Sequence, residues 1–461
     1  MNTEIHAFEL PEASPVQALA RAFAAAGGRA LVVGGWVRDR VLGREPLDLD
    51  LEVHALEAEA VTEVLESFGR VKRVGQSFAV FLVKGLELQI GLPPPGVAPG
   101  SSGSESEIAV ALRRRDLTMN SMAWDPLSCE LFDPHHGRRD LRLRVLRATD
   151  RESFGSDPLR ALRVAQFAAR FGMRPDAELS ELCAACDLSA LPGERMLEEF
   201  RKLLVLGERP AAGLQLLKQA DLLRFFPELG ALVDVPQDAQ WHPEGDVWAH
   251  TLLAVAAAAQ LRSDDGFGNQ VLMFATLCHD LGKADVTEEL EGRVVSHGHE
   301  SAGVELAGRL LGRLRAPAAL TTAVEVLVRH HRAPVSFATE GAGPRAYRRL
   351  ARQLTSAGVS FELLERVARA DQLGRFAGRA PSRDFPEGRL FLERAREYLG
   401  HSSPRRDVVK GRHLIARGLE PGPGFGRILE RCREVQDDTG WSQASRILDR
   451  VLGELAGPEQ G

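Results

Sequence analysis

Residues 34–53 read GGWVRDRVLGREPLDLDLEV, a glycine pair followed by a run in which acidic and apolar residues alternate. Alternation is typical of a β-strand, and it puts Asp48 and Asp50 on the same face. Two carboxylates one pleat apart can share a pair of divalent ions that clamp the reacting oxygens of a phosphoryl transfer. Gly34 and Gly35 precede a predicted helix, whose N-terminal N–H groups favour a triphosphate. Taken singly, a glycine pair is more often a simple turn, and alternating carboxylates more often mark a solvent-facing strand.

Around this segment the hydrophobic pattern predicts a small α/β unit. We expect helices over residues 15–27 and 56–68 and strands over residues 29–33, 48–53, 79–83 and 86–90. Residues 93–107 are rich in Pro, Gly and Ser and predict a loop or linker. From Asp157 onward the pattern is helical. The expected fold class is therefore α+β, with a mixed-sheet head followed by helical modules.

Length and charge set broad limits on this chain. Its 461 residues predict three or four modules. The formal net charge of −6 does not indicate a nucleic-acid binder, but phosphate contacts need only a local basic surface such as Arg113–Arg114–Arg115. We find no apolar run long enough to cross a bilayer and no signal-peptide pattern, so we expect a cytoplasmic protein without membrane contact.

The five cysteines are an odd number in a large chain, which argues against a disulfide framework. Cys183 and Cys186 form a C-x-x-C pair inside a predicted helix. Without a second pair a zinc site is not expected, and we interpret both as packed or surface thiols.

Together, the glycine turn and the alternating carboxylates resemble the signature of the class II tRNA nucleotidyltransferase and bacterial poly(A) polymerase family. The resemblance continues at residues 114–121 (RRDLTMNS), at residues 157–163 (DPLRALR), at Glu194-Arg195 and at residues 199–204 (EFRKLL). The motifs follow one another in the family's order over about the first half of the chain. This conjunction is far more specific than any single motif.

The resemblance implies that Asp48 and Asp50 hold catalytic Mg²⁺ ions. It implies a nucleotide site formed by Gly34, Gly35, Arg38, Arg115, Asp116, Asn120, Asp157, Arg160 and Arg163. Within that site the two glycines and Arg38 would cradle the triphosphate, and Arg115 and Asp116 would contact the ribose. Whether Glu87 supplies a third catalytic carboxylate stays open.

Asp157 and Arg160 are the residues that the resemblance assigns to reading the incoming base. They stand three positions apart on a predicted helix, so their side chains are neighbours. A carboxylate supplies acceptors and a guanidinium supplies donors, which together can imitate a complementary base. The alternative is a salt bridge on a helix surface.

Three departures from the family pattern bear on the product. Ser156 stands where relatives have Glu, and Ala111 replaces an acidic residue five positions before Asp116. Relatives carry an arginine-containing flexible loop that helps the site switch from CTP to ATP. Here residues 92–107 contain three consecutive prolines and no arginine. The chain could therefore add C-C-A, or add only C-C and leave the adenosine to a separate A-adding enzyme.

A second set of residues in the helical region resembles the HD phosphohydrolase family. The sequence CHDLGK at residues 278–283 and WHPE at residues 241–244 carry the resemblance. It implies metal ligands at His250, His279, Asp280 and Asp371, with His299, His330 and His331 as accessory residues. Imidazole and carboxylate groups suit a divalent transition metal or Mg²⁺. In relatives such a domain hydrolyses 2′,3′-cyclic phosphates and phosphomonoesters.

The sequence thus predicts four domains: a nucleotidyltransferase head (1–150), a helical neck and body (151–235), an HD domain (236–380) and a helical tail that contacts tRNA (381–461). The predicted function is template-independent addition of C-C or C-C-A to the tRNA 3′ end, with tRNA, CTP and possibly ATP as partners. The alternatives are a poly(A) polymerase, and a catalytically inactive RNA- or nucleotide-binding relic.

Overall fold

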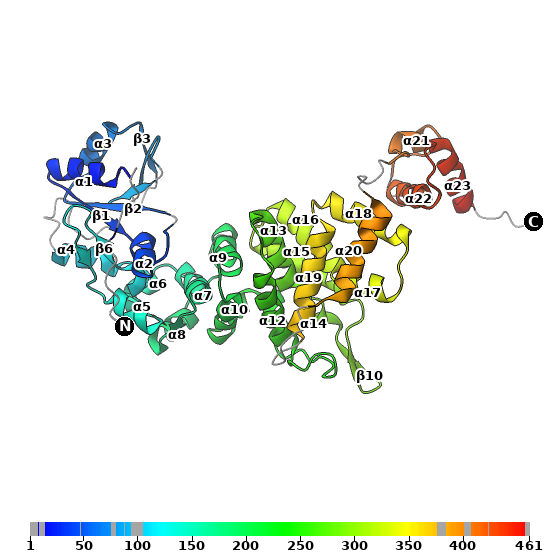
Figure 1. The fold of residues 1–461 in the computed structure, drawn as a ribbon, viewed down its shortest axis with the longest axis horizontal. Coiled ribbons are helices and arrows are strands. Elements are labelled where there is room, and N and C mark those ends of the chain that lie inside the picture. The colour runs from blue at the N-terminus through cyan, green and yellow to red at the C-terminus, as the bar shows by residue number, and fades with distance from the viewer. Residues whose placement is uncertain are drawn as a thin grey trace, which may run out of the picture. The chain divides into compact units, whose positions relative to one another are not determined.

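The computed structural model describes residues 8, 14–46, 48–74, 80–86, 88–93, 105–375, 384–400, 407–422 and 424–456. Glu87 and residues 94–104 of the proline-rich segment therefore lie outside the described residues. The chain divides into two compact units, Met1–Phe225 and Phe226–Gly461 (Figure 1).

A mixed sheet forms the centre of the first unit. Its order is β3-β4-β5-β2-β1-β6-β7. The strands are β1 (Arg29–Val33), β2 (Asp50–His54), β3 (Val71–Val74), β4 (Val80–Val83), β5 (Gln89–Gly91), β6 (Ala123–Trp124) and β7 (Leu131–Phe132). Central β2 pairs antiparallel with β1 and parallel with β5. Val33 pairs with Asp50, so the glycine turn after β1 and the first carboxylate of β2 meet at one edge of the sheet.

Four helices accompany the sheet: α1 (Val16–Ala25), α2 (Gly35–Val41), α3 (Ala58–Glu66) and α4 (Glu105–Arg113). Helix α1 packs against β1 and α3. Leu31 and Val33 of β1 form a buried cluster with Ile108 and Leu112 of α4. Both faces of β1 are apolar, so helices can pack on both sides of the strand, and the predicted α+β head results.

The rest of the first unit is mostly helical. Its elements are the 3-10 turn η1 (Thr118–Asn120), α5 (Gly137–Leu143), β8 (Val145–Leu146), α6 (Arg151–Gly155), α7 (Leu159–Phe171), β9 (Arg174–Pro175), α8 (Ala177–Ala184), α9 (Gly193–Val205), α10 (Pro210–Gln219) and η2 (Leu222–Phe225). Helix α7 packs against α9 and α10. The expectation of helices alone after Asp157 was wrong at β9, which pairs with β8 over two residues and is too short for a periodic pattern.

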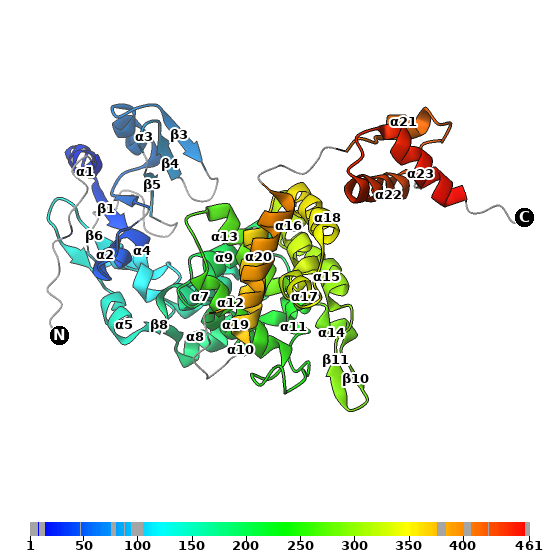
Figure 2. The same ribbon diagram turned by 45° about the vertical axis from the view of Figure 1, so that its right-hand side comes forward.

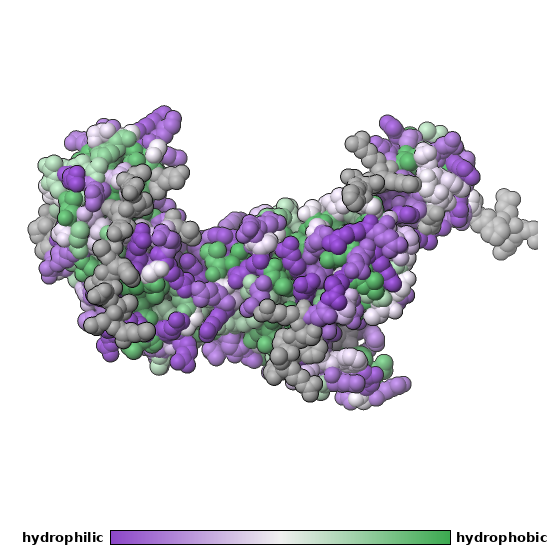
Figure 3. Space-filling view, in the orientation of Figure 1, coloured by the Kyte–Doolittle hydropathy of each residue, from purple (hydrophilic) through white to green (hydrophobic). Residues whose placement is uncertain are grey.

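The second unit is a helical body with one hairpin. It contains α11 (Pro227–Gly230), α12 (Val247–Gln260), α13 (Gly266–Cys278), α14 (Lys283–Val286), β10 (Glu288–Leu290), β11 (Arg293–Val295), α15 (His299–Arg313), α16 (Ala318–His330), α17 (Ala333–Thr339), α18 (Pro344–Ser356), α19 (Phe361–Gly374) and α20 (Pro386–Leu399). Helix α12 packs along α19, and α13 packs on α16. The hairpin projects beyond α14 (Figure 2), and mostly hydrophilic side chains cover it (Figure 3).

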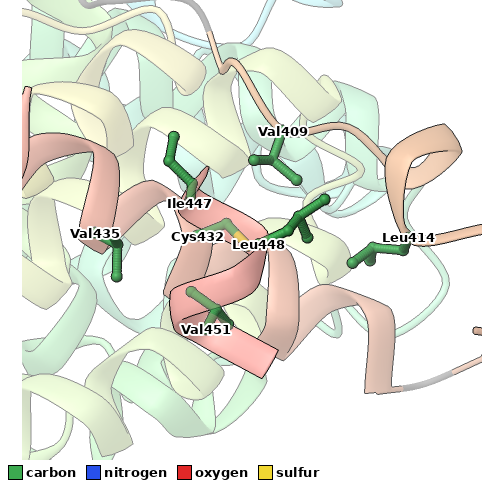
Figure 4. Packing of buried hydrophobic residues seen from close by; sticks show 7 residues of the cluster. All are labelled: Val409, Leu414, Cys432, Val435, Ile447, Leu448 and Val451. Carbon is green, nitrogen blue, oxygen red and sulfur yellow. The ribbon is translucent and has the colours of Figure 1, made fainter. Parts of the chain in front are cut away.

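Three further helices, α21 (Gly411–Ile415), α22 (Gly424–Thr439) and α23 (Ala444–Ala456), form the tail. Their apolar faces enclose a small core of their own (Figure 4). Its buried members are Val409, Leu414, Cys432, Val435, Ile447, Leu448 and Val451. Burial of these side chains away from water is what holds the tail helices together.

All five cysteines lie within the described residues, and all are free thiols. Cys183 and Cys186 are buried, so they are packed thiols. Burial raises the pKa of both. Cys129, in the turn between β6 and β7, is exposed. None of the helices among the described residues is long and apolar enough to cross a membrane.

Candidate active sites

The glycine turn after β1 brings the backbone close to an arginine. Gly34 has a φ of 71°, in the region that favours glycine. A Cβ atom at this position would lie 2.9 Å from Nη1 of Arg115. The turn therefore needs glycine for its backbone conformation and for the space that Arg115 fills.

Asp50, the first residue of β2, lies beside the same arginine, and Asp48 precedes the strand, which begins two residues later than predicted. Asp50 is half-buried at the start of the strand, and Asp48 is exposed two residues earlier. Burial raises the pKa of Asp50, Arg115 lowers it, and the charge of Asp48 raises it again. The two aspartates are thus close enough to repel each other, which a shared cation would relieve. On the same face of β2, Glu52 accepts a hydrogen bond from Nη2 of Arg115 at 3.1 Å.

A buried chain of hydrogen bonds runs behind this edge. Arg38 donates to Oδ1 of Asn120 at 2.8 Å and pairs with its neighbour Asp39. The Asn120 amide donates to Asp116 at 3.0 Å, and Nε of Arg163 donates to the other Asp116 oxygen at 2.7 Å. Arg38 and Asp116 are 5% and 7% exposed. In this structure both hold the site's framework, and their predicted contacts with triphosphate and ribose stay predictions.

A pocket of about 840 Å³ opens on the other side of this network. Its lining includes six arginines: Arg113, Arg114, Arg115, Arg160, Arg163 and Arg195. Such a concentration of guanidinium groups suits a polyanionic ligand. Asp116 and Asp157 line the same pocket.

The two predicted base-reading residues both line this pocket, and both have protein partners. Asp157 accepts a hydrogen bond from the amide of Leu159, the first residue of α7, at 3.1 Å and pairs with Arg195 at 2.8 Å. Arg160 donates to the carbonyl oxygens of Ser153 and Arg114, each at 2.7 Å. The main-chain amide of Arg160 donates to the Asp157 carbonyl at 3.0 Å, but among the described residues their side chains form hydrogen bonds with other partners and not with each other.

In the second unit, four buried histidines share one orientation. Nδ1 of each lies 2.7–2.8 Å from an oxygen that can only accept: the Glu244 carboxylate for His250, and the carbonyls of Thr276, Ser296 and Val328 for His279, His299 and His331. Each Nδ1 therefore donates, which fixes the tautomer and turns Nε2 inward.

The inward Nε2 atoms meet two carboxylates. At the inward atoms His250, His279 and Asp371 form one candidate metal-binding group, and Asp280, His299 and His331 form another; a further group, His242, Glu244 and His250, gathers around the Glu244 carboxylate instead. Nε2 of His250 lies 3.1 Å from Asp371, and Nε2 of His279 lies 3.2 Å from Asp280. These residues come from α12, the end of α13, α15, the end of α16 and α19. The bundle thus gathers six of the seven predicted HD residues.

His330 is the predicted residue that the structure leaves out of both groups. Its side chain is half-buried beside Arg329 and Arg349, and burial lowers its pKa to about 4. At the end of a helix, consecutive side chains point about 100° apart, so only His331 of the pair can face the cluster.

The donor set fits a divalent cation. Nε2 of His250 and Nε2 of His279 lie 3.3 Å apart, and in neutral imidazoles with a protonated Nδ1 both carry lone pairs. Two facing lone pairs repel, whereas a cation between them satisfies both. The carboxylates are also ionised: burial would raise the pKa of Asp280 and Asp371, but the cations Lys283 beside Asp280 and Arg375 beside Asp371 help to hold these pKa values well below the usual range.

Three residues that sequence reasoning did not assign hold the predicted ones in place. Glu244 is fully buried and bridges Nδ1 of His242 and Nδ1 of His250. Glu52 anchors Arg115, and Arg195 anchors Asp157. Glu52 could have been found from the alternation of β2, because it shares a face with Asp50. Glu244 lies in a loop, where no periodicity marks it, but it ends the WHPE sequence that carries the HD resemblance.

Three family models match this chain. Residues 30–147 match the poly(A) polymerase head domain, residues 180–232 a probable RNA- and SrmB-binding site of polymerase A, and residues 247–370 the HD domain. The head match contains Asp48 and Asp50. The HD match contains five of the six clustered residues, and the sixth, Asp371, lies one position beyond its end.

Solved structures of CCA-adding enzymes share the fold. The Bacillus stearothermophilus CCA-adding enzyme in complex with CTP is 21% identical, with a TM-score of 0.62 over 96% of this chain and 98% of that one. The Thermotoga maritima CCA-adding enzyme complexed with tRNA is 21% identical, with a TM-score of 0.52 over 95% and 94%. A CCA-adding enzyme with ATP is 21% identical, with a TM-score of 0.54 over the same shares.

Proposed function

We propose that this chain, a nucleotidyltransferase of the CCA-adding and poly(A) polymerase type with an HD domain, adds C-C or C-C-A to the 3′ end of tRNA. The observation that carries the proposal is the meeting of Gly34, Arg115 and Asp50 at one edge of the sheet. The six-arginine pocket beside that edge supports a nucleoside triphosphate as the donor substrate. CCA-adding enzymes with the same fold form complexes with CTP, with ATP and with tRNA, which supports the same substrates here.

In this proposal Asp48 and Asp50 hold Mg²⁺, which supplies charge neutralisation for the 3′-oxygen and the pyrophosphate. Arg115 stands beside the carboxylates and binds the phosphates, because its guanidinium is partly exposed toward the glycine turn. Asp157 and Arg160 read the base edge through donors and acceptors that their protein partners leave free. Arg195 and Ser153 orient these two side chains.

The decisive experiment supplies tRNA lacking its 3′ end with CTP alone, ATP alone or both, and sizes the products at nucleotide resolution. Extension by two nucleotides, with no use of ATP on a C-C end, identifies a C-C-adding enzyme. Extension by three identifies C-C-A addition. A long adenosine tail from ATP alone would instead identify the poly(A) polymerase alternative.

The relic alternative makes a different prediction for Asp48→Ala. An enzyme that uses this carboxylate loses incorporation in the variant but keeps its affinity for tRNA. A relic shows no incorporation with or without the substitution. We favour the enzyme because Asp48, Asp50 and Arg115 stay together at an open edge, where a decayed site would have lost its mutually repelling carboxylates.

We further propose a metal-dependent phosphohydrolase activity for the HD domain. The convergence of four Nε2 atoms on Asp280 and Asp371 favours it. A bound metal supplies an activated water for attack on a phosphoester. The test is hydrolysis of a nucleoside 2′,3′-cyclic phosphate and of a phosphomonoester by protein loaded in turn with Mn²⁺, Ni²⁺, Zn²⁺ or Mg²⁺, with metal content measured in each case.

A further inference from the structure

The pocket in front of the HD cluster has an aromatic wall that the proposed chemistry does not use. This pocket measures about 420 Å³, and its lining includes Asp280, His299 and His331. Trp241 lines it as well, with 58% of its surface exposed. All five tryptophans lie within the described residues, and Trp241 is the exposed one. An exposed indole at a pocket is a costly feature unless something covers it.

The loop that carries Trp241 is anchored along its length. The Trp241 amide donates to the Asp238 carbonyl at 3.0 Å, and the Asp238 carboxylate accepts from the Gln240 amide at 2.9 Å. Lys283 donates to Gln237 at 2.8 Å, which ties the loop to α14. The next residue, His242, is held by Glu244. The backbone is thus fixed while the indole stays uncovered, which is the arrangement of a preformed contact surface.

The same loop is coupled to the metal ligands. Glu244 bonds both His242 and His250, and the rings of these histidines meet edge to face at 4.9 Å. Trp241 therefore stands one residue from a side chain that touches a candidate metal ligand. A ligand stacked on the indole has its other end near the cluster.

The lining of the pocket also contains arginines. Arg293 of the hairpin and Arg332 line it, with side chains 63% and 59% exposed. Arg293 reaches Asp238 at 3.2 Å and so joins the hairpin to the Trp241 loop. An aromatic face for a base and guanidinium groups for phosphates form the recurring combination of single-stranded nucleic-acid sites.

We infer that Trp241 is a stacking platform for a nucleobase, so that the HD pocket takes a nucleotide with a terminal phosphate rather than a small phosphomonoester without a base. The nucleotide is either free or the last residue of an RNA. The inference rests on the proposed phosphohydrolase activity for its substrate class, but the platform itself is a binding property. The phosphate lies toward the cluster, and Arg293 and Arg332 contact the phosphate or its neighbour along the RNA.

Binding measurements test the platform independently of turnover. The full-length protein, loaded with Mn²⁺, is titrated with cytidine 3′-phosphorothioate, with ribose 5-phosphate and with a short RNA ending in a 3′-phosphorothioate. We expect Trp241→Ala to weaken binding of both nucleotide ligands about 5- to 100-fold and to leave ribose 5-phosphate unchanged. Trp241→Phe keeps an aromatic face and should stay within about 3-fold of wild type. The nucleotide-induced quench of tryptophan fluorescence should disappear in Trp241→Ala.

Phe267→Ala is the matched control, because Phe267 is an exposed aromatic of the same unit that is 46% exposed. The head is the same in all these variants, so any binding of the nucleotide to the head contributes equally to each measured affinity and cancels when the variants are compared. Equal affinity of wild type and Trp241→Ala for cytidine 3′-phosphorothioate would overturn the inference, as would an equal loss for ribose 5-phosphate. A wild type that binds through Trp241 but hydrolyses no phosphoester would refute the phosphohydrolase proposal and leave the platform standing. Tighter binding of the RNA than of the mononucleotide would identify the ligand as the last residue of an RNA, and the reverse would identify it as a free nucleotide.

Discussion

The two candidate sites prepare their ligand atoms in opposite ways. In the HD cluster every inward nitrogen is fixed by a hydrogen bond on the far side of its ring, and the cluster residues are buried. In the head, Asp48 is exposed and Asp50 half-buried, and the surrounding arginines bond to Glu52, Asp116 and Asp157. The HD cluster thus presents its ligand atoms without any substrate, whereas under the proposed function a triphosphate would draw the arginines and the metal of the head together.

This difference predicts separate metal behaviour. A preoriented set of imidazoles and carboxylates retains a transition metal through dialysis. Two open aspartates hold Mg²⁺ weakly until the phosphates of a nucleotide complete the coordination. If the contrast holds, a substitution in one site should leave the activity and the metal content of the other site unchanged.

The largest effect is expected for Asp50→Asn. Loss of a metal carboxylate removes several kcal/mol of transition-state stabilisation, so CTP incorporation should fall about 10³-fold or more. Hydrolysis by the HD domain and its retained metal should not change. Incorporation is measured with radiolabelled CTP, and Glu45→Gln, an exposed carboxylate outside the strand, is the control. Incorporation within tenfold of wild type would remove Asp50 from the catalytic set.

The mirror experiment is His279→Gln, which removes one of the inward Nε2 atoms. Phosphoester hydrolysis should fall about 10²- to 10³-fold, since a first ligand of the activating metal is lost. Metal retained after dialysis should fall in parallel, while CTP incorporation stays at the wild-type rate. His330→Gln is the adjacent control, because His330 lies outside both candidate groups. If His330→Gln were as damaging as His279→Gln, the geometry of the cluster would be wrong.

A smaller effect is expected for Glu244→Gln. Both His242 and His250 donate to the same Glu244 oxygen, Oε1, and in the amide this oxygen carries no charge, so both hydrogen bonds weaken. Loss of such an orienting partner should weaken metal affinity about 10- to 100-fold. Competition with a metal-binding dye measures it. Metal affinity equal to wild type would show that the His250 ring is oriented by packing alone.

The smallest effect concerns the glycine turn. Gly34→Ala places a Cβ atom 2.9 Å from Arg115 on a backbone with a φ of 71°, and should cost about 1–3 kcal/mol of unfolding free energy. Displacement of Arg115 should also raise the KM for CTP. Gly35→Ala is the matched control, since the nearest atom to its Cβ would be Nη2 of Arg38 at 3.5 Å, an ordinary van der Waals distance, and Gly35 has no positive φ. Thermal melts and kinetics of the two variants should differ; equal behaviour would contradict the close approach seen at Gly34.

Sequence patterns predicted the buried elements better than the exposed ones. Strand β1 was expected over residues 29–33, and the structure has Arg29–Val33, because its apolar run is buried on both faces. Strand β3 was missed, since its sequence VKRV is mostly exposed and shows no buried alternation. The hairpin β10–β11 was missed for the same reason: its first strand is fully exposed. A strand with a buried face needs apolar residues at regular positions, and this hydrophobic period can be read from the sequence. A solvent-exposed strand has no such requirement and therefore shows no period.

The site residues follow a similar rule. The family resemblance assigned His279 and Asp280 as metal ligands, but it did not distinguish His330 from His331. Which of two neighbouring helical side chains faces the cluster depends on how the helix packs. The partners of functional residues were hardest to predict. Arg195 reaches Asp157 across 38 positions and Glu52 reaches Arg115 across 63, and such distances in the chain carry no local pattern.

Cys129 is the one cysteine whose thiol is exposed and accessible to thiol-reactive reagents. The other four cysteines are buried, and desolvation raises their pKa values, which suppresses the thiolate that maleimides attack. A dye added to the unaltered protein should therefore attach at the turn between β6 and β7. Since β7 is an edge strand of the sheet, a fluorophore there would label the head without any engineered substitution.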